Sequence, residues 1–167
     1  MANRLAADRL RELLEYDPEG GQFRWRVGRQ GVRANRNGAA GGPDGQGYTR
    51  IKVDGTYYGA HRLAWLYMTG DWPAGQIDHS DGDRGSNRWA NLRDVSVRVN
   101  RQNMRRATSR SKTGLLGVYA PETPGNGFGA AIRDGGKSRR LGTFETPEEA
   151  HAAYVTAKRE IHEGCTI

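Results

Sequence analysis

A run of basic residues without a single acid interrupts the chain between Arg98 and Lys112. Charge of one sign between two folded parts is typical of a linker, either a solvated tether or an arm that lies along phosphates; we favour the arm. With 167 residues the chain can hold one modest domain or two small ones. We therefore predict a first domain over residues 1–105, a basic linker over 106–112 and a second domain over 113–167.

The composition favours a reducing compartment and a polyanionic partner. The net charge is +7, and nucleic acid is the commonest partner for such a surplus, although charge alone is weak support. Cys165 is the only cysteine, which excludes an internal disulfide and a cysteine zinc cage. The charged first residues lack the apolar stretch of a signal peptide, and no apolar run reaches the length of a membrane span. We therefore expect a cytoplasmic protein without a membrane partner.

The apolar spacing of the first part predicts short helices and small antiparallel sheets. Asp54-Gly55 between two alternating runs is a strong signal for a hairpin with a two-residue turn. The expected helices cover about residues 3–16, 61–69 and 97–105, and the expected strands cover 22–27, 48–53, 56–60, 77–78 and 92–95.

The second part reads as three short antiparallel strands followed by one helix. The strands are expected at 116–120, 128–134 and 138–144, and Thr146-Pro147 opens the helix as N-cap and first-turn proline. One helix covers one face of the sheet and leaves the other face free. Candidate DNA contacts on that face are Arg133, Lys137, Arg139 and Arg140; solvent exposure alone is the alternative. The fold class is α+β.

The stretch from Ile77 to Asn103 carries the strongest chemical signal. Asp78 and Asn100 offer oxygen ligands that suit one Mg²⁺ or Mn²⁺, and His79 is a candidate general base if the strand ends there. The carbonyl or amide of Asn91 is a candidate to orient the imidazole. Taken alone, an adjacent Asp and His can equally be structural.

The order and gaps of these residues resemble the HNH endonucleases of phages and their mobile introns. The resemblance rests on His61-Arg62-Leu63-Ala64-Trp65, Ile77-Asp78-His79, Asp81-Gly82-Asp83, Asn87, Asn91-Leu92-Arg93 and Asn100-Arg101-Gln102-Asn103. It implies a ββα-metal core at about 76–105, with Asp78 and Asn100 as metal ligands and His79 as general base. It also implies Asn91 as the residue that braces the loop and His79. Ser80 departs from the family pattern, which has an apolar residue there.

Several other residues carry weaker expectations. His61, with Arg62, is expected to contact phosphate or support the site; the alternative for His61 is a helix cap. Asn87 is interpreted as a residue that shapes the loop rather than a ligand. Further DNA contacts are expected from Arg101, Arg105 and Arg106 in the basic run.

The second part is similar to the plant APETALA/ethylene-response-type DNA-binding domain, which also occurs appended to phage HNH nucleases. The matching residues are Gly117-Val118, Phe128, Ala130, Ile132, Leu141-Gly142-Thr143-Phe144, Glu148-Glu149-Ala150 and Ala153-Tyr154. In that family the sheet enters the major groove, so the resemblance implies groove contacts here. Phe128 stands where a Trp is usual, which implies a weaker contact if that side chain touches DNA.

These observations predict a metal-dependent HNH endonuclease of phage or homing type that acts on double-stranded DNA. The alternative is a sequence-specific DNA-binding protein on a nuclease scaffold without cleavage activity, and a weaker one is a nuclease for RNA or structured DNA. One active centre per chain fits a nicking monomer or a homodimer that cuts both strands. Deletion from Thr113 onward is expected to weaken or broaden site choice and leave the chemistry intact.

Overall fold

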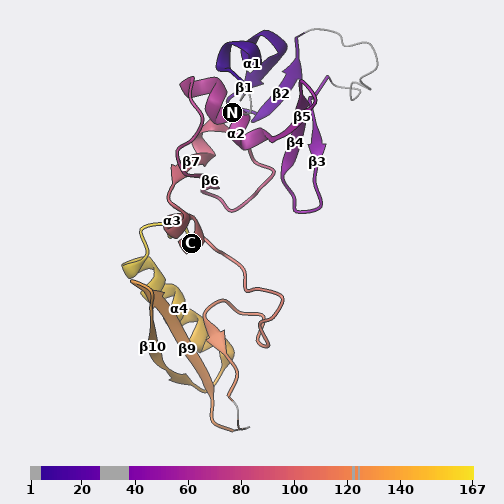
Figure 1. The fold of residues 1–167 in the computed structure, drawn as a ribbon. Helices are drawn as coiled ribbons and strands as arrows, with labels where there is room; N and C mark the ends of the chain where they lie inside the picture. Colours follow the sequence, from indigo (N-terminus) through magenta and orange to yellow (C-terminus); the bar gives the residue numbers. More distant parts are fainter. Residues whose placement is uncertain (1–4, 27–37, 122, 124) are drawn as a thin grey trace. The chain divides into compact units, whose positions relative to one another are not determined.

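The computed structural model describes residues 5–26, 38–121, 123 and 125–167, and the chain divides into two compact units, Met1–Ser96 and Val97–Ile167. The expected α+β class is confirmed, because the described residues form short helices and small antiparallel sheets (Figure 1). The division falls at Ser96, whereas the sequence predicted a first domain that extends to residue 105. Within the described residues no helix has the length and hydropathy that a bilayer crossing requires.

The first unit begins with a helix and a two-stranded sheet. Helix α1 spans Ala7–Leu13, strand β1 spans Leu14–Asp17, and β2 spans Gln22–Trp25. The predicted helix over 3–16 was wrong at its C-terminal end. Residues from Leu14 onward extend instead and pair with β2, which buries Leu14 and Tyr16.

A three-stranded sheet and a helix follow. Strands β3 (Gly42–Pro43), β4 (Thr49–Val53) and β5 (Thr56–Gly59) form the sheet, and α2 (Ala60–Thr69) follows directly. The predicted two-residue turn is confirmed: Asp54 has φ 45° and Gly55 has φ 85°, as such a turn requires. Gly70 ends α2 in the left-handed conformation.

A second hairpin completes the first unit. Strand β6 spans Gln76–His79, a loop and the 3-10 turn η1 (Trp89–Asn91) follow, and β7 spans Leu92–Val95. The antiparallel register pairs Asp78 with Arg93 and His79 with Leu92. Ile77 and Leu92 from this hairpin belong to the main core, so the strand that carries Asp78 and His79 is fixed to the body of the unit.

The second unit begins with a short helix that packs on the end of the chain. Helix α3 spans Val97–Gln102. Its Arg98 forms an ion pair with Glu163 at 2.9 Å, and the Gly164 N–H donates to Gln102 Oε1 at 3.3 Å. A Cβ at Gly164 would lie 2.2 Å from the Val99 carbonyl oxygen, so only glycine permits this approach.

The rest of the second unit is a three-stranded sheet with one helix against it (Figure 1). The strands are β8 (Val118–Tyr119), β9 (Phe128–Asp134) and β10 (Lys137–Phe144), in the order β10-β9-β8, and the helix α4 spans Pro147–Ile161. A capping box joins Thr146 and Glu149 at the start of α4, as the sequence predicts. Ala130 and Ile132 of β9 pack against α4 residues, so one face of the sheet is buried under the helix.

Candidate active site

The loop between β6 and β7 is held in shape by one amide side chain. Asn91 Oδ1 accepts the Asp81 N–H at 2.9 Å, and Asn91 Nδ2 donates to Asp81 Oδ1 at 2.9 Å and to the Ser86 carbonyl at 2.7 Å. The Asn91 carbonyl accepts the Ser80 N–H at 2.9 Å. Asn91 therefore ties both ends of the loop together through its backbone and its side chain.

The loop places a second amide against the candidate base. His79 is 4% exposed, and its Nε2 lies 3.2 Å from Asn87 Oδ1. Asn87 Nδ2 donates to the Gly85 carbonyl at 3.2 Å, which fixes the amide so that its oxygen faces the imidazole. An oxygen acceptor at Nε2 puts the ring proton there and the basic lone pair on Nδ1.

The front of the chain supports this arrangement from outside the loop. The Tyr16 hydroxyl donates to the Asn87 carbonyl at 2.6 Å, and the Trp89 N–H donates to the Pro18 carbonyl at 2.9 Å. Gly21 has φ +70°, and a Cβ there would lie 2.5 Å from the backbone of Asn87. The turn after β1 therefore packs directly on the loop that holds Asn87 against His79.

Two aromatic rings, those of His61 and Tyr48, lie close to the imidazole of His79. The His61 ring lies 5.4 Å from the His79 ring, and the Tyr48 ring lies 5.2 Å from His61 and 6.0 Å from His79. Burial, with smaller contributions from His79 and Arg62, lowers the pKa of His61 to about 4. His61 is thus neutral at physiological pH, and its buried Nδ1 has no hydrogen-bond partner among the described residues.

Asp78 lies on the same strand with its carboxylate buried. It is 5% exposed, and its Oδ2 accepts from Arg93 Nη2 across the hairpin. The pair follows from the register, because opposed residues on antiparallel strands project to the same face. One carboxylate oxygen of the candidate metal ligand is therefore held by a guanidinium.

A second carboxylate in the loop has a structural task. Burial would raise the pKa of Asp81, but hydrogen bonds from the Asp83 N–H and Asn91 Nδ2 outweigh it and lower the pKa below its ordinary value. A carboxylate with these bonds stays ionised and helps to hold the loop.

The remaining candidates of the central segment lie on different elements. Asn100 lies on α3 in the second unit, whereas Asp78 lies on β6 in the first unit. Arg62 has its guanidinium carbon 5.7 Å from the centre of the Trp72 ring. Arg101 and Arg106 are exposed, and Arg105 donates to the Thr166 carbonyl at 2.8 Å.

The register of the second sheet separates its four basic candidates, which are all exposed. Arg139 pairs with Ile132, and Ile132 faces α4. Arg140 pairs with Ala131, and Arg133 pairs with Ser138. Because side chains alternate along a strand, both arginines lie on the face away from α4. Lys137 pairs with Asp134 and shares the side of Arg139.

The face of the sheet away from α4 also carries an aromatic ring. Tyr119 pairs with Gly129, and a Cβ at Gly129 would lie 2.0 Å from Tyr119 Cζ, so the ring covers the glycine. Arg140 donates to Thr143 Oγ1 on the same face. This face therefore presents Tyr119 beside two arginines.

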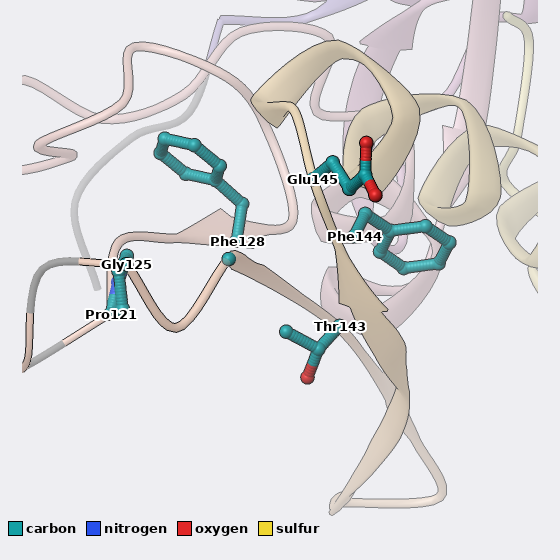
Figure 2. A pocket seen from close by; sticks show the side chains of 7 residues that line it. Pro121, Gly125, Phe128, Thr143, Phe144 and Glu145 are labelled. Carbon is teal, nitrogen blue, oxygen red and sulfur yellow. The ribbon is translucent and has the colours of Figure 1, made fainter.

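A shallow pocket in the second unit offers no comparable chemistry. It lies beside the paired ends of β9 and β10, with Phe128, Thr143, Phe144 and Glu145 among its lining residues (Figure 2). Glu145 is the only ionisable group in the lining, so the described residues there supply neither an acid–base pair nor a nucleophile with its base.

Comparison with known proteins finds a family match for the central segment. Residues 58–102 match the HNH endonuclease family. The match supports an HNH nuclease, and the matched HNH segment includes His61, Asp78, His79, Asn91 and Asn100. No curated protein and no solved structure matches the chain. Residues 113–167 lie outside the matched segment.

The structure adds two residues to the candidates predicted from the sequence. Asn87 was interpreted as shaping the loop, and it also contacts the His79 ring directly. Its place in a polar loop after an Asp-His pair is visible in the sequence, but the sequence does not reveal which amide reaches which ring nitrogen. Tyr48 was missed as well, because it lies 31 positions from His79 in the sequence and the two rings come within 6.0 Å only in the folded chain.

Proposed function

We propose that this protein is a metal-dependent DNA endonuclease of the HNH type, of phage or homing origin, that hydrolyses phosphodiester bonds. The observation that carries the proposal is the hydrogen bond between Asn87 Oδ1 and His79 Nε2 inside the segment that matches the HNH endonuclease family. This hydrogen bond fixes the tautomer of His79 that a general base needs. An adjacent Asp and His without such a bond can equally be structural.

In the proposed reaction His79 takes a proton from the attacking water. The lone pair on Nδ1 accepts this proton, while the Nε2–H bond to Asn87 keeps the ring in place. Asn91 keeps the loop, and with it Asn87, in shape. His61 is neutral, so it offers an uncharged imidazole beside the site and does not compete with His79 for a proton at neutral pH.

The proposed ligands carry the donor atoms that a hard divalent cation prefers. Asp78 would supply a carboxylate and Asn100 would supply an amide oxygen, and such oxygen ligands suit Mg²⁺ or Mn²⁺ better than a metal that prefers sulfur or clustered imidazole ligands. Such an ion, when bound, stabilises the negative charge that develops on the phosphate and on the leaving oxygen. Arg93 fixes one oxygen of Asp78 and leaves the carboxylate oriented by the strand pairing.

The second unit is proposed to bind double-stranded DNA through the sheet face away from α4. Arg133 and Arg140 lie on that face, and arginine is the side chain that most often reads guanine in the major groove. Lys137 and Arg139 lie on the other side of the hairpin, where contact with backbone phosphates is the better assignment. Arg101, Arg105 and Arg106 would add backbone contacts before the sheet.

The wider setting is also a proposal. We infer that the protein acts in the host cytoplasm as a nicking monomer or as a homodimer that cuts both strands, with site choice aided by the second unit. A DNA-binding protein without cleavage is the second candidate. It is less favoured because a protein that only binds needs neither a fixed His79 tautomer nor the carboxylate of Asp78.

The decisive experiment combines cleavage and binding. Plasmid DNA with Mg²⁺ or Mn²⁺ is expected to be nicked or cut by the purified protein, and EDTA is expected to stop the reaction. His79→Ala should remove cleavage and retain DNA binding, because the side chain acts as base and not as a phosphate ligand. Cleavage by His79→Ala at the wild-type rate would refute the assignment of the base. Binding without cleavage by the wild-type protein under all metal conditions would favour the second candidate.

A further inference from the structure

An arginine in the braced loop has a fixed position beside the site. Arg84 lies between Asp83 and Gly85, and Asp83 Oδ1 accepts the Gly85 N–H at 2.9 Å. Asp81 Oδ1 accepts the Asp83 N–H at 2.8 Å, and Asn91 holds Asp81 in turn. The backbone on both sides of Arg84 is therefore tied into the same hydrogen-bond network that positions Asn87 against His79.

The side chain of Arg84 leans across to the ring of Tyr48. Its guanidinium carbon lies 5.0 Å from the centre of the Tyr48 ring, and Nη1 donates to the Gln46 carbonyl at 3.2 Å. The planar guanidinium combines a ring contact on its face with five N–H donors at its edge. The ring and the carbonyl together restrict the side chain, which remains exposed to solvent.

Tyr48 connects this guanidinium to the proposed catalytic histidines. The same ring lies 5.2 Å from His61 and 6.0 Å from His79. Arg84 is thus separated from the His79 imidazole by a single aromatic ring. Because the guanidinium carbon lies 5.0 Å and the His79 ring centre 6.0 Å from the centre of the Tyr48 ring, the two groups are at most about 11 Å apart. This is about three nucleotide steps of a DNA strand, at a rise of about 3.4 Å per step.

We propose that Arg84 binds a backbone phosphate of the DNA strand that enters the His79 site, and that Tyr48 holds its guanidinium in position for this contact. The proposal rests on the proposed endonuclease function and names a phosphate-binding residue of that site. No carboxylate of the described residues forms an ion pair with Arg84 within 4.0 Å, so its charge is directed to solvent and to whatever anion approaches. Guanidinium and phosphate form paired charge-assisted hydrogen bonds.

A surface contact that only stabilises the fold is the competing explanation. An exposed cation–π contact stabilises a fold by roughly 0.5–1 kcal/mol and predicts no effect on DNA binding. The two explanations therefore differ in the salt dependence of binding, because each phosphate contact by a basic side chain contributes about 0.9 to the slope of log K against log salt.

The experiment measures affinity for a duplex oligonucleotide in Ca²⁺ or EDTA, over about 50 to 200 mM salt. Arg84→Gln is expected to weaken binding by roughly fivefold to tenfold at the lower salt and to reduce the slope by about 0.9. Arg84→Lys should keep most of the slope, since the charge remains. Arg24→Gln removes the same charge from the exposed side of β2 and is the matched control, with a slope near that of the wild type.

The role of Tyr48 is tested by a double-mutant cycle. Tyr48→Phe keeps the ring and should bind as the wild type, whereas Tyr48→Leu should lose part of the affinity that Arg84→Gln loses. If Tyr48 acts by positioning Arg84, Tyr48→Leu with Arg84→Gln binds no more weakly than Arg84→Gln alone. Additive losses would overturn the positioning role.

The outcomes separate this proposal from the proposed function. Wild-type affinity and slope in Arg84→Gln would overturn the phosphate contact, even if the wild-type protein cleaves plasmid. A reduced slope in Arg84→Gln supports the contact, even if cleavage by the wild-type protein is absent and the endonuclease assignment fails.

Discussion

Two asparagines near His79 have different roles. Asn91 holds the loop through Asp81 and Ser86, and Asn87 contacts the His79 ring. Both side chains are buried, so their amide groups depend on these bonds for the hydrogen bonding that water would otherwise supply. The sequence predicts that Asn91 braces both the loop and His79, and in the structure Asn87 Oδ1 also lies 3.2 Å from His79 Nε2.

Replacement of Asn87 should affect the rate more than substrate binding. Asn87→Ala removes the acceptor that fixes the His79 tautomer, so we expect kcat to fall by about tenfold to a hundredfold with KM little changed. Asn87→Asp adds a charge that stabilises the imidazolium, which should move the acid limb of the pH–rate profile to higher pH. Exposed Asn126→Ala is the control, and steady-state cleavage at several pH values is the measurement. An unchanged profile in both Asn87 variants would contradict the orientation role.

His61 should make folding stability depend on pH. Its pKa is about 4 in the folded protein against an ordinary value of 6.5, so the unfolded chain takes up the proton first as pH falls. The free energy of unfolding should therefore drop between about pH 6.5 and pH 4, by at most about 3 kcal/mol from this residue. Urea unfolding at several pH values measures it. His61→Gln should flatten this part of the curve and the control His151→Gln should not.

The register of strand pairing decides which residues lie opposite each charged side chain. The β6–β7 register sets Arg93 opposite Asp78, and the β9–β10 register sets Arg140 opposite Ala131. A shift of one residue in either hairpin would move these side chains to the other face. The register of the paired strands therefore decides which side chains lie next to each other.

The pair of Arg93 and Asp78 predicts a measurable coupling. Arg93→Met leaves a buried carboxylate without its guanidinium, which should destabilise the protein by about 2 kcal/mol. The same change in an Asp78→Asn background should cost clearly less. Arg9→Met breaks an exposed pair with Asp54 and should cost much less than Arg93→Met, because solvent screens exposed ion pairs, which makes it the control. Denaturant unfolding measures each value, and equal costs in the two backgrounds would show that the pair does not stabilise the fold.

The sheet of the second unit predicts unequal effects of equal charge changes. Arg133→Gln with Arg140→Gln alters the face away from α4, and Lys137→Gln with Arg139→Gln alters the opposite side. We expect the first double variant to change cleavage-site preference, and the second to lower affinity at all sites with little change in preference. Sequencing of cleavage ends on a defined DNA library measures this. The same loss of preference in both double variants would contradict the assignment of the faces.

At the scale of the whole molecule, α3 belongs to the second unit. This helix carries Asn100 and packs on the C-terminal residues through Arg98–Glu163 and Gln102–Gly164. The sequence places the helix in the first domain and predicts that the residues from Thr113 onward can be removed without loss of chemistry.

The packing of α3 leads to a different expectation for that deletion. Removal of residues 113–167 takes away Glu163, Gly164 and Thr166, which hold the segment of Asn100 and Arg105. We therefore expect the shortened protein to lose most cleavage activity and to bind metal more weakly, measured by plasmid cleavage and by calorimetry with Mn²⁺. Arg133→Gln with Arg140→Gln is the comparison, since it should retain cleavage of plasmid DNA. Full cleavage by the shortened protein would show that α3 needs no support from the second unit.

The sequence alone determined the local elements whose signals lie within a few residues. The Asp54-Gly55 turn, the strand Leu92–Val95 and the helix that Thr146 and Pro147 open are set by backbone angles, alternation and capping. The candidate residues of the HNH segment could also be predicted, because their order along the chain carries the resemblance. The end of the first helix could not, since Leu14 extends only because β2 is available to pair with it.

Only the tertiary structure decided which side chains meet. Tyr16 and Gly21 pack on Asn87, and Tyr48 reaches the histidines and Arg84, across separations that no local pattern encodes. The physical reason is that turns and helices follow from interactions between near neighbours, whereas a site depends on how whole elements bury their apolar faces against one another. That burial fixes which ring nitrogen of His79 receives an acceptor, and which basic residues lie on the face of the second sheet away from α4.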